Sequence, residues 1–361
     1  MQPLLPPTAR QALQAVRQGD VPALRKFLNA EPDAVADPRL LNEAALVGNS
    51  EIVRLLLSCG SDPNLAVPSH EFYRPLHRAI EHRGHPRRPG HGEVVEALLE
   101  AGASLEARST WMQLTPMGVA GMAGDREIID RLWAEGTKRT LYMAAVTADV
   151  SGVRRFLRRK SAATAKDENH MTPLHYAALC GLADADQERR EIAGLLLDAG
   201  GDPDACEPIG PYPATPVLHF AVWKNYPLAE MLLSRGANPN LGFSNCLWRP
   251  PGPMAELFRR HGADINGRYS TGELYLHSRI HWNLPSVALW LLQHGADPNL
   301  RTASGNTALH EAATRGINPK VVEALLAKGA DPEAKNAEGL TALDIAKARQ
   351  RVKLIPLLER P

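Results

Sequence analysis

The sequence predicts an all-α repeat array of about eleven helix-turn-helix units, connected by short projecting loops or hairpins. Two recurring phrases and their spacing support this prediction. The first phrase is most complete at residues 172–175, Thr-Pro-Leu-His. The second contains Gly, a small residue and Asp, and three successive copies begin at Gly262, Gly295 and Gly329. These copies recur with a period of about 33 residues, and self-similarity at such a period is typical of stacked supersecondary units.

Elementary helix chemistry explains each part of the unit. In the phrase at residues 172–175, the Thr hydroxyl can cap free backbone amides, and Pro is tolerated at the first helical position. A left-handed glycine is expected to end this first helix. A second helix follows, with apolar residues at helical spacing as in residues 321–326. The glycines expected to end first helices include Gly48, Gly181 and Gly316.

The two phrases resemble those of the ankyrin repeat, and the resemblance covers nearly the whole chain. It implies an α-solenoid that binds another macromolecule, most often a protein. Fold alone does not establish such a function. The chain also has no Gly-x-Ser-x-Gly, Walker-type, His-Glu-x-x-His or strand-based Gly-x-Gly-x-x-Gly motif. The sequence therefore predicts a protein-binding scaffold or inhibitor that is not an enzyme and uses no cofactor and no metal.

Composition restricts the partners and the compartment. The 41 Lys and Arg residues nearly balance the 40 Asp and Glu residues, which leaves a formal charge of +1. There is thus no global attraction to nucleic acid or to an anionic membrane. The start of the chain has no export signal, and no apolar run approaches the roughly 20 residues that span a bilayer. Four scattered cysteines favour reduced thiols. We therefore expect a monomeric cytoplasmic protein, and the Ala-, Arg- and Leu-rich usage favours a bacterial one.

Both ends of the array carry the polar residues expected of capping repeats. Residues 9–28 read as a polar first unit and residues 340–358 as a charged last unit, so we expect no appended catalytic domain. Between them, the projecting loop is missing at residues 135–140. We therefore expect two sub-arrays, residues 1–137 with the N-terminal cap and residues 138–361 with the C-terminal cap.

Irregular places in the repeat are the best candidates for a specific site. Gly236 and Gly262 are clearly closer together in the sequence than the ordinary period of the repeat. Residues 241–262 are therefore expected to be a degenerate unit, in which the Pro- and Gly-rich residues 248–253 replace the first helix. Two insertions are expected as well, at residues 82–92 and at residues 182–190.

Most of the candidate metal-binding histidines have a structural explanation. Five recur at the fourth position of the repeat phrase, where the resemblance implies hydrogen bonds that tie neighbouring units together: His77, His175, His219, His277 and His310. The insertion at residues 82–92 holds three further histidines, His82, His85 and His91, which could ligate zinc. Neighbouring arginines disfavour a bound cation, and the insertion has no Cys or acidic ligand. We expect a solvated loop there, or a surface for an anionic partner that includes Arg87 and Arg88.

A second basic cluster extends from Lys138 to Lys166, where eight basic residues face one acidic residue, Asp149. Four of its arginines are spaced i,i+4 and are expected to form two adjacent rows on one helix: Arg154, Arg155, Arg158 and Arg159. The rows are interpreted either as a solvated outer face or as a surface for an acidic protein. Nucleic acid is disfavoured because no stacking aromatic residues are interleaved with the arginines.

The resemblance also implies a concave recognition groove that is lined by the ends of the first helices. The residues mapped to it by their place in the repeat are Trp223, Lys224, His281, Trp282 and Arg315. To these we add Trp248 of the degenerate unit, His82 of the insertion, and Arg78 and Tyr176, which follow repeat histidines.

The three tryptophans of this set have more than one explanation. They are expected to form an aromatic cluster on the groove, because Trp and Arg are the usual anchors of protein interfaces. Alternatively, their rings only fill the space left by the deletion in the degenerate unit. A third hypothesis is a closed polar pocket near Trp248 that binds a small molecule or supports a reaction, with Arg249, Arg259 and His281 as its polar residues.

Overall fold

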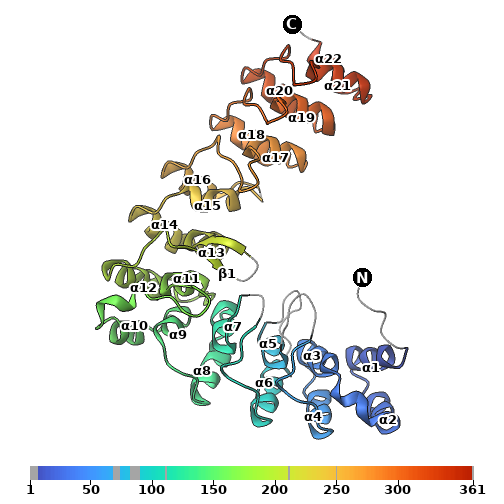
Figure 1. Cartoon of the computed structure of the whole chain (residues 1–361), viewed down its shortest axis with the longest axis vertical. Helices are drawn as coiled ribbons and strands as arrows, with labels where there is room; N and C mark the ends of the chain where they lie inside the picture. Colours follow the sequence, from blue (N-terminus) through green and yellow to red (C-terminus); the bar gives the residue numbers. More distant parts are fainter. Residues whose placement is uncertain are drawn as a thin grey trace. The chain divides into compact units, whose positions relative to one another are not determined.

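The computed structural model describes residues 7–67, 74–81, 90–109, 112–209, 212–248 and 250–359. It contains two compact units, Met1–Leu228 and Ala229–Pro361. Within the described residues, 22 α-helices follow one another along the chain as eleven pairs, each with a first and a second helix (Figure 1). The prediction of an all-α array of about eleven helix-turn-helix units is confirmed.

The first unit holds six complete helix pairs, together with the first helix of a seventh. Two short 3-10 helices, η1 (Pro32–Ala36) and η2 (Lys160–Ala162), follow the first and fifth pairs. The helices are α1 (Pro7–Gln18), α2 (Val21–Ala30), α3 (Pro38–Val47), α4 (Ser50–Ser58), α5 (Pro75–Ile80), α6 (Gly90–Glu100), α7 (Pro116–Ala123), α8 (Arg126–Ala134), α9 (Leu141–Val146), α10 (Val150–Phe156), α11 (Pro173–Leu179), α12 (Asp186–Asp198) and α13 (Val217–Lys224).

The second unit holds the last four pairs. The helix before them, α14 (Tyr226–Ser234), contains the boundary between the two units. The four pairs are α15 (Asn240–Cys246) with α16 (Pro253–Arg260), α17 (Tyr275–His281) with α18 (Pro285–Gln293), α19 (Ala308–Arg315) with α20 (Pro319–Ala327), and α21 (Ala342–Ala348) with α22 (Ile355–Leu358).

One projecting loop is a regular β-hairpin. Strands β1 (Cys206–Ile209) and β2 (Tyr212–Pro216) pair in antiparallel fashion between α12 and α13. In the register of this hairpin, Cys206 lies opposite Pro216 and Glu207 lies opposite Thr215.

The core of each unit lies between successive helix pairs. In the first unit, first helices pack in sequence from α1 through α3, α5, α7, α9 and α11 to α13, and in the second unit α17 packs on α19 and α19 on α21. Small residues allow this close approach. Ala177 and Ala178 of α11 and Ala312 and Ala313 of α19 are buried at these contacts.

Four of the five repeat histidines, His77, His175, His277 and His310, connect neighbouring helix pairs as predicted. The buried His175 accepts hydrogen bonds at Nδ1 from the Thr172 amide, at 3.2 Å, within its own unit. Its Nε2–H donates to the Thr215 carbonyl, 40 residues further along the chain, at 3.1 Å. The same bond to the next repeat is made by His77 to Leu114 at 3.1 Å, by His277 to Asn306 at 3.1 Å and by His310 to Leu340 at 3.0 Å.

Two of the three predicted glycine caps are present. Gly48 and Gly316 end their helices with φ of 76° and 70°, in the left-handed region that glycine adopts without a steric penalty. The prediction for Gly181 is wrong. Helix α11 is capped by Cys180 with φ of −53°, and the Gly181 amide instead donates to the Gly121 carbonyl of another repeat at 2.8 Å.

The degenerate unit differs from its prediction. Its first helix is present as α15, which begins directly after Pro239. The prediction that residues 248–253 replace this helix is therefore wrong. The missing segment is the projecting loop, since only five residues separate α14 from α15 (239 − 234). The Asn238 side chain starts the turn by accepting the Asn240 amide at 3.0 Å.

At residues 135–140, where the sequence predicts that the projecting loop is missing, the structure has only a short connection between helices. Helix α8 ends at Ala134 and α9 begins at Leu141. Packing of first helices continues across this place from α7 to α9. The division into sub-arrays 1–137 and 138–361 stays a prediction.

Parts of the two predicted insertions belong to regular helices. Residues 82–89 lie outside the described residues, but His91 belongs to α6, is buried, and donates from Nε2 to the Leu46 carbonyl at 3.2 Å. Grouping His91 with loop residues is therefore wrong. In the other insertion, the buried Arg189 of α12 donates to the Cys180 carbonyl at 2.9 Å and pairs with Asp186.

Candidate protein-binding surface

Two tryptophans with half-exposed side chains lie in the second unit. Trp248 follows the C-cap of α15 and is 50% exposed, and Trp282 is the C-cap of α17 and is 58% exposed. They thus occupy nearly equivalent positions, at the ends of the first helices of consecutive pairs. Large apolar side chains that remain this exposed are candidate interface residues.

Trp248 is held in place by an arginine. The guanidinium carbon of Arg279 lies 4.3 Å from the centroid of the Trp248 ring and 4.7 Å from that of the Tyr269 ring. Arg279 also donates from Nη1 to the Leu247 carbonyl at 3.1 Å and from Nη2 to the Ser278 hydroxyl at 3.0 Å. One face of the indole is therefore fixed against α17, while the rest of the ring stays accessible.

The Arg279 guanidinium has an unusual environment. Its side chain is 0% exposed, and this burial lowers the pKa of the guanidinium. Among the residues that the structure describes, it forms no ion pair with a carboxylate, so aromatic faces and a carbonyl replace the counter-ion. Arg279 thereby couples the degenerate unit to the pair that follows it.

The sequence analysis did not single out Arg279. A signal was nevertheless present, because Arg279 stands two residues after the repeat histidine, where other units have the first alanine of the phrase, such as Ala177 and Ala312. A large charged residue at a position of close helix packing requires space. The Arg279 side chain occupies the space between the end of α15 and the Tyr269 ring.

A polar cluster lies next to Trp282. The Glu311 Oε1 atom lies 2.8 Å from His281 Nδ1 and 3.3 Å from Arg315 Nε, and Arg315 Nη2 lies 2.6 Å from His281 Nδ1. The imidazole also meets the Trp282 ring edge to face, with centroids 5.4 Å apart. Three of the predicted partner-binding residues, His281, Trp282 and Arg315, are therefore brought together from α17 and α19.

Other predicted residues lie elsewhere. Tyr176 is 2% exposed, and its hydroxyl donates to Asp167 at 2.7 Å. Burial and the Asp167 charge raise the pKa of this phenol. Tyr176 is thus a packing residue of the first unit, not part of an accessible surface. Arg78 is partly exposed on α5.

Several predicted residues lie beyond what the structure describes. Trp223 and Lys224 belong to α13 of the first unit, but their side chains are outside the described part. Four more of the predicted residues lie entirely outside the described part of the chain: His82, Arg87, Arg88 and Arg249. Their proposed roles stay predictions.

The basic cluster is exposed but is not arranged as predicted. Helix α10 ends at Phe156, so Arg158 and Arg159 come after it, and two rows of arginines on one helix do not form. Arg154 pairs with Glu191 at 2.6 Å, and Arg155 lies over the Phe156 ring at 5.0 Å. All four arginines are exposed.

The proposed polar pocket near Trp248 is not supported by the geometry around it. Arg279 and Tyr269 occupy the space against the indole. Arg259 is engaged on its own helix by the Glu256 carboxylate at 2.6 and 2.8 Å. Its hydrogen bonds lower the pKa of Glu256 to about 2.

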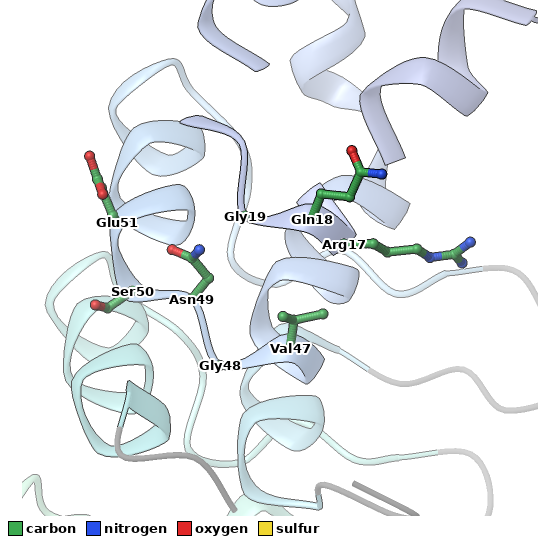
Figure 2. A pocket seen from close by; sticks show the side chains of 8 residues that line it. All are labelled: Arg17, Gln18, Gly19, Val47, Gly48, Asn49, Ser50 and Glu51. Carbon is green, nitrogen blue, oxygen red and sulfur yellow. The ribbon is translucent and has the colours of Figure 1, made fainter. Parts of the chain in front are cut away.

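A hollow of about 420 Å³ lies beside the turns at Gly19 and Gly48 (Figure 2), where Arg17 pairs with Glu43 at 2.6 Å. Among the described residues, no cluster of three or more His, Cys, Asp or Glu side chains is placed to hold a metal ion. No described helix is both long enough and apolar enough to cross a membrane.

Comparisons with known proteins agree with this architecture. Models of ankyrin repeats match residues 12–109 as three copies, residues 291–346 as many copies, and residues 169–207 and 216–242 as single repeats. Cyclin-dependent kinase 4 inhibitor B of Bos taurus is 32% identical over 121 residues, which cover 32% of this chain and 82% of the inhibitor. The inhibitor of Mus musculus is 32% identical over 127 residues, with 33% and 88% covered.

A longer alignment extends over more of the chain. Ankyrin repeat protein nuc-2 of Neurospora crassa is 26% identical over 248 residues, which cover 64% of this chain but only 22% of nuc-2. The stacked helix pairs and these matches together define a repeat protein of the ankyrin type. The chain belongs to the ankyrin-repeat family.

Proposed function

We propose that this protein acts as a scaffold or inhibitor that binds a partner protein through an aromatic surface, defined as Trp248, His281, Trp282 and Arg315. The observation that carries the proposal is the pair of half-exposed indoles at consecutive first-helix ends. Trp and Arg are the residue types that most often dominate binding energy at protein interfaces.

The energy available from this surface is substantial. An aromatic side chain buries about 150–250 Å², so half of an indole offers about 100 Å² to a partner. At about 25 cal/mol per Å², each tryptophan would contribute about 2.5 kcal/mol on binding. Arg279 already contacts the Trp248 ring, and His281, which is bonded to Glu311, contacts the Trp282 ring. Less side-chain entropy is therefore lost when a partner binds.

The relatives favour the same type of function. Two of the similar proteins bear the name of a kinase inhibitor, which supports an inhibitor that acts by binding. Trp223 and Lys224 of α13 stay candidate partner-binding residues of the first unit, and the exposed basic cluster at Arg154–Arg159 favours a partner with acidic residues.

A pull-down from the source cells tests the proposal. The tagged Trp248→Ala/Trp282→Ala variant should recover at least about tenfold less partner than the wild type, since loss of a hot-spot residue costs about 2 kcal/mol or more. Leu340→Ala, which shortens another exposed apolar side chain of the second unit, is the matched control. Undiminished recovery by the double variant, with circular dichroism unchanged, would exclude the aromatic surface as the binding site.

A further inference from the structure

A groove of about 750 Å³ is present in the second unit. Its walls are three successive turns between first and second helices, at residues 283–285, 316–319 and 350–354. We call it the turn groove. Asn283 in its wall directly follows Trp282 of the aromatic surface.

The turns that form the groove carry only positive charge. Residues 282–286, 315–320 and 349–354 contain no Asp or Glu, and their basic residues are Arg315, Lys320, Arg349, Arg351 and Lys353. Glu311 neutralises Arg315. Within the part of the chain that is described, the other four form no ion pair, and Arg351 and Lys353 line the groove.

Two helix ends add to this positive potential. Helices α18 and α20, of nine residues each, begin at the groove with Pro285 and Pro319 and have no acidic residue in their first turns. The corresponding helices of the first unit differ, since each has an acidic residue either at its N-cap, as α2 and α10 do with Asp20 and Asp149, or in its first turn, as α4 and α8 do with Glu51 and Glu127. The partial positive charge of the helix N-terminus is therefore compensated in the first unit and uncompensated at the turn groove.

Arg351 is held in the groove wall in advance of binding. Its Nη2 donates to the Thr314 carbonyl of the preceding repeat at 2.8 Å. The guanidinium packs so closely on Gly316 that a Cβ at that position would lie 2.9 Å from its Cζ. Its Nε is buried and has no hydrogen-bond partner among the described residues. The adjacent Val352 is 74% exposed, so an apolar contact lies beside the fixed cation.

We propose that the turn groove binds an acidic peptide segment of the partner, with carboxylates near Arg351 and Lys353 and an apolar side chain on Val352. This inference rests on the proposed function and names the chemistry of the partner. An acidic protein segment fits better than nucleic acid, because no aromatic ring lines the groove for bases to stack on.

Fluorescence anisotropy on the full chain tests the groove. The probe is a fluorescein-labelled 12-residue peptide that repeats Glu-Leu-Glu-Ser. A control peptide has Gln in place of each Glu. We expect the Glu peptide to bind and the Gln peptide to bind at least about tenfold more weakly, with a strong salt dependence. A Glu peptide that fails to bind, or two peptides that bind equally, would overturn the proposal.

Charge variants locate the site. Lys353→Glu should weaken binding of the Glu peptide about threefold, and Arg351→Gln/Lys353→Glu about tenfold, as expected for exposed charge pairs. Lys328→Glu reverses an exposed charge at the other end of α20 and should leave the affinity unchanged. Equal affinity of the groove variants and the wild type would refute the assignment, even if Arg351→Gln proved destabilising, because the exposed Lys353 can be changed alone.

The two proposals fail separately. The Trp248→Ala variant should still bind the Glu peptide, so loss of the pull-down with peptide binding retained would support both. Retained pull-down in Trp248→Ala/Trp282→Ala alongside groove-dependent peptide binding would remove the aromatic surface and leave the groove. A concentration-dependent dimer in sedimentation velocity that Lys353→Glu abolishes would assign the groove to a second copy of this chain and refute an acidic partner segment.

Discussion

Acidification should destabilise the first unit through His77. This histidine is buried, and its Nε2–H donates to the Leu114 carbonyl at 3.1 Å. Burial lowers its pKa from 6.5 to about 4, and the hydrogen bond to Leu114 only partly opposes that effect. Because the folded pKa lies below the unfolded one, the stabilisation is complete above pH 6.5 and is lost as the pH falls towards 4.

The magnitude follows from proton linkage. For pKa values of about 4 and 6.5, lowering the pH from about 7.5 to 5.0 removes about 2 kcal/mol from the free energy of unfolding. Urea unfolding followed by circular dichroism at the two pH values measures this loss. His77→Gln places an amide nitrogen near the position of Nε2, so it should keep the fold and lack this part of the pH dependence.

A control separates burial from the simple presence of an imidazole. His170→Asn removes an exposed histidine of the same unit, at a position with φ of 63° that Asn tolerates. It should preserve the full pH dependence. If His77→Gln lost as much stability between the two pH values as the wild type, the buried neutral imidazole would not be the cause.

Two further changes test the packing between repeats, and a third, Gly194→Ala, serves as a control. His310→Ala removes the bond to Leu340 and the reciprocal bonds to its own N-cap, so it should lower the free energy of unfolding by about 2–4 kcal/mol in urea titrations; a loss below about 1 kcal/mol would show that these bonds are not coupled to the fold. Gly121→Ala places a Cβ 2.7 Å from Val146 Cγ2 and 2.8 Å from its carbonyl oxygen, which should cost about 1–3 kcal/mol. Gly194→Ala meets nothing within 4 Å and should stabilise its helix by about 0.5–1 kcal/mol; the reverse order in melting temperature would contradict the structure.

The regular part of the fold was predictable because successive repeats share the same local sequence pattern. The Thr-Pro-Leu-His phrase specifies a helix cap, the start of a helix and a hydrogen bond to the next repeat. Thr172 and His175 form the cap at the start of α11, and His175 makes the bond to the next repeat. The same local reasoning failed where tertiary packing decided the conformation. Prolines near residue 250 suggested a lost helix, yet α15 forms in the segment before them and buries Phe243.

The candidate site was only partly accessible to sequence reasoning. The exposure of Trp282 follows from its place at the end of a first helix, which the repeat register gives. The place of Trp248 at a helix end did not follow from the sequence, since residues 248–253 were expected to replace that helix. The burial of Tyr176 does not, because its partners Asp167 and Tyr142 come from a preceding loop and the preceding pair. Arg279 was missed since its role depends on two rings, Trp248 and Tyr269, that are close only in the folded unit.

The absence of a projecting loop before α15 has a consequence for mechanical extension. The repeat from Gly236 to Gly262 is shorter than the one that follows it, from Gly262 to Gly295. At about 3.5 Å per extended residue, their contour lengths are about 90 Å and about 115 Å. When the chain is pulled from both ends in a single-molecule experiment, the short repeat should release a distinctly smaller step. The order in which that step occurs among the larger ones would show whether the joint held by Arg279 yields before or after the joints held by histidines.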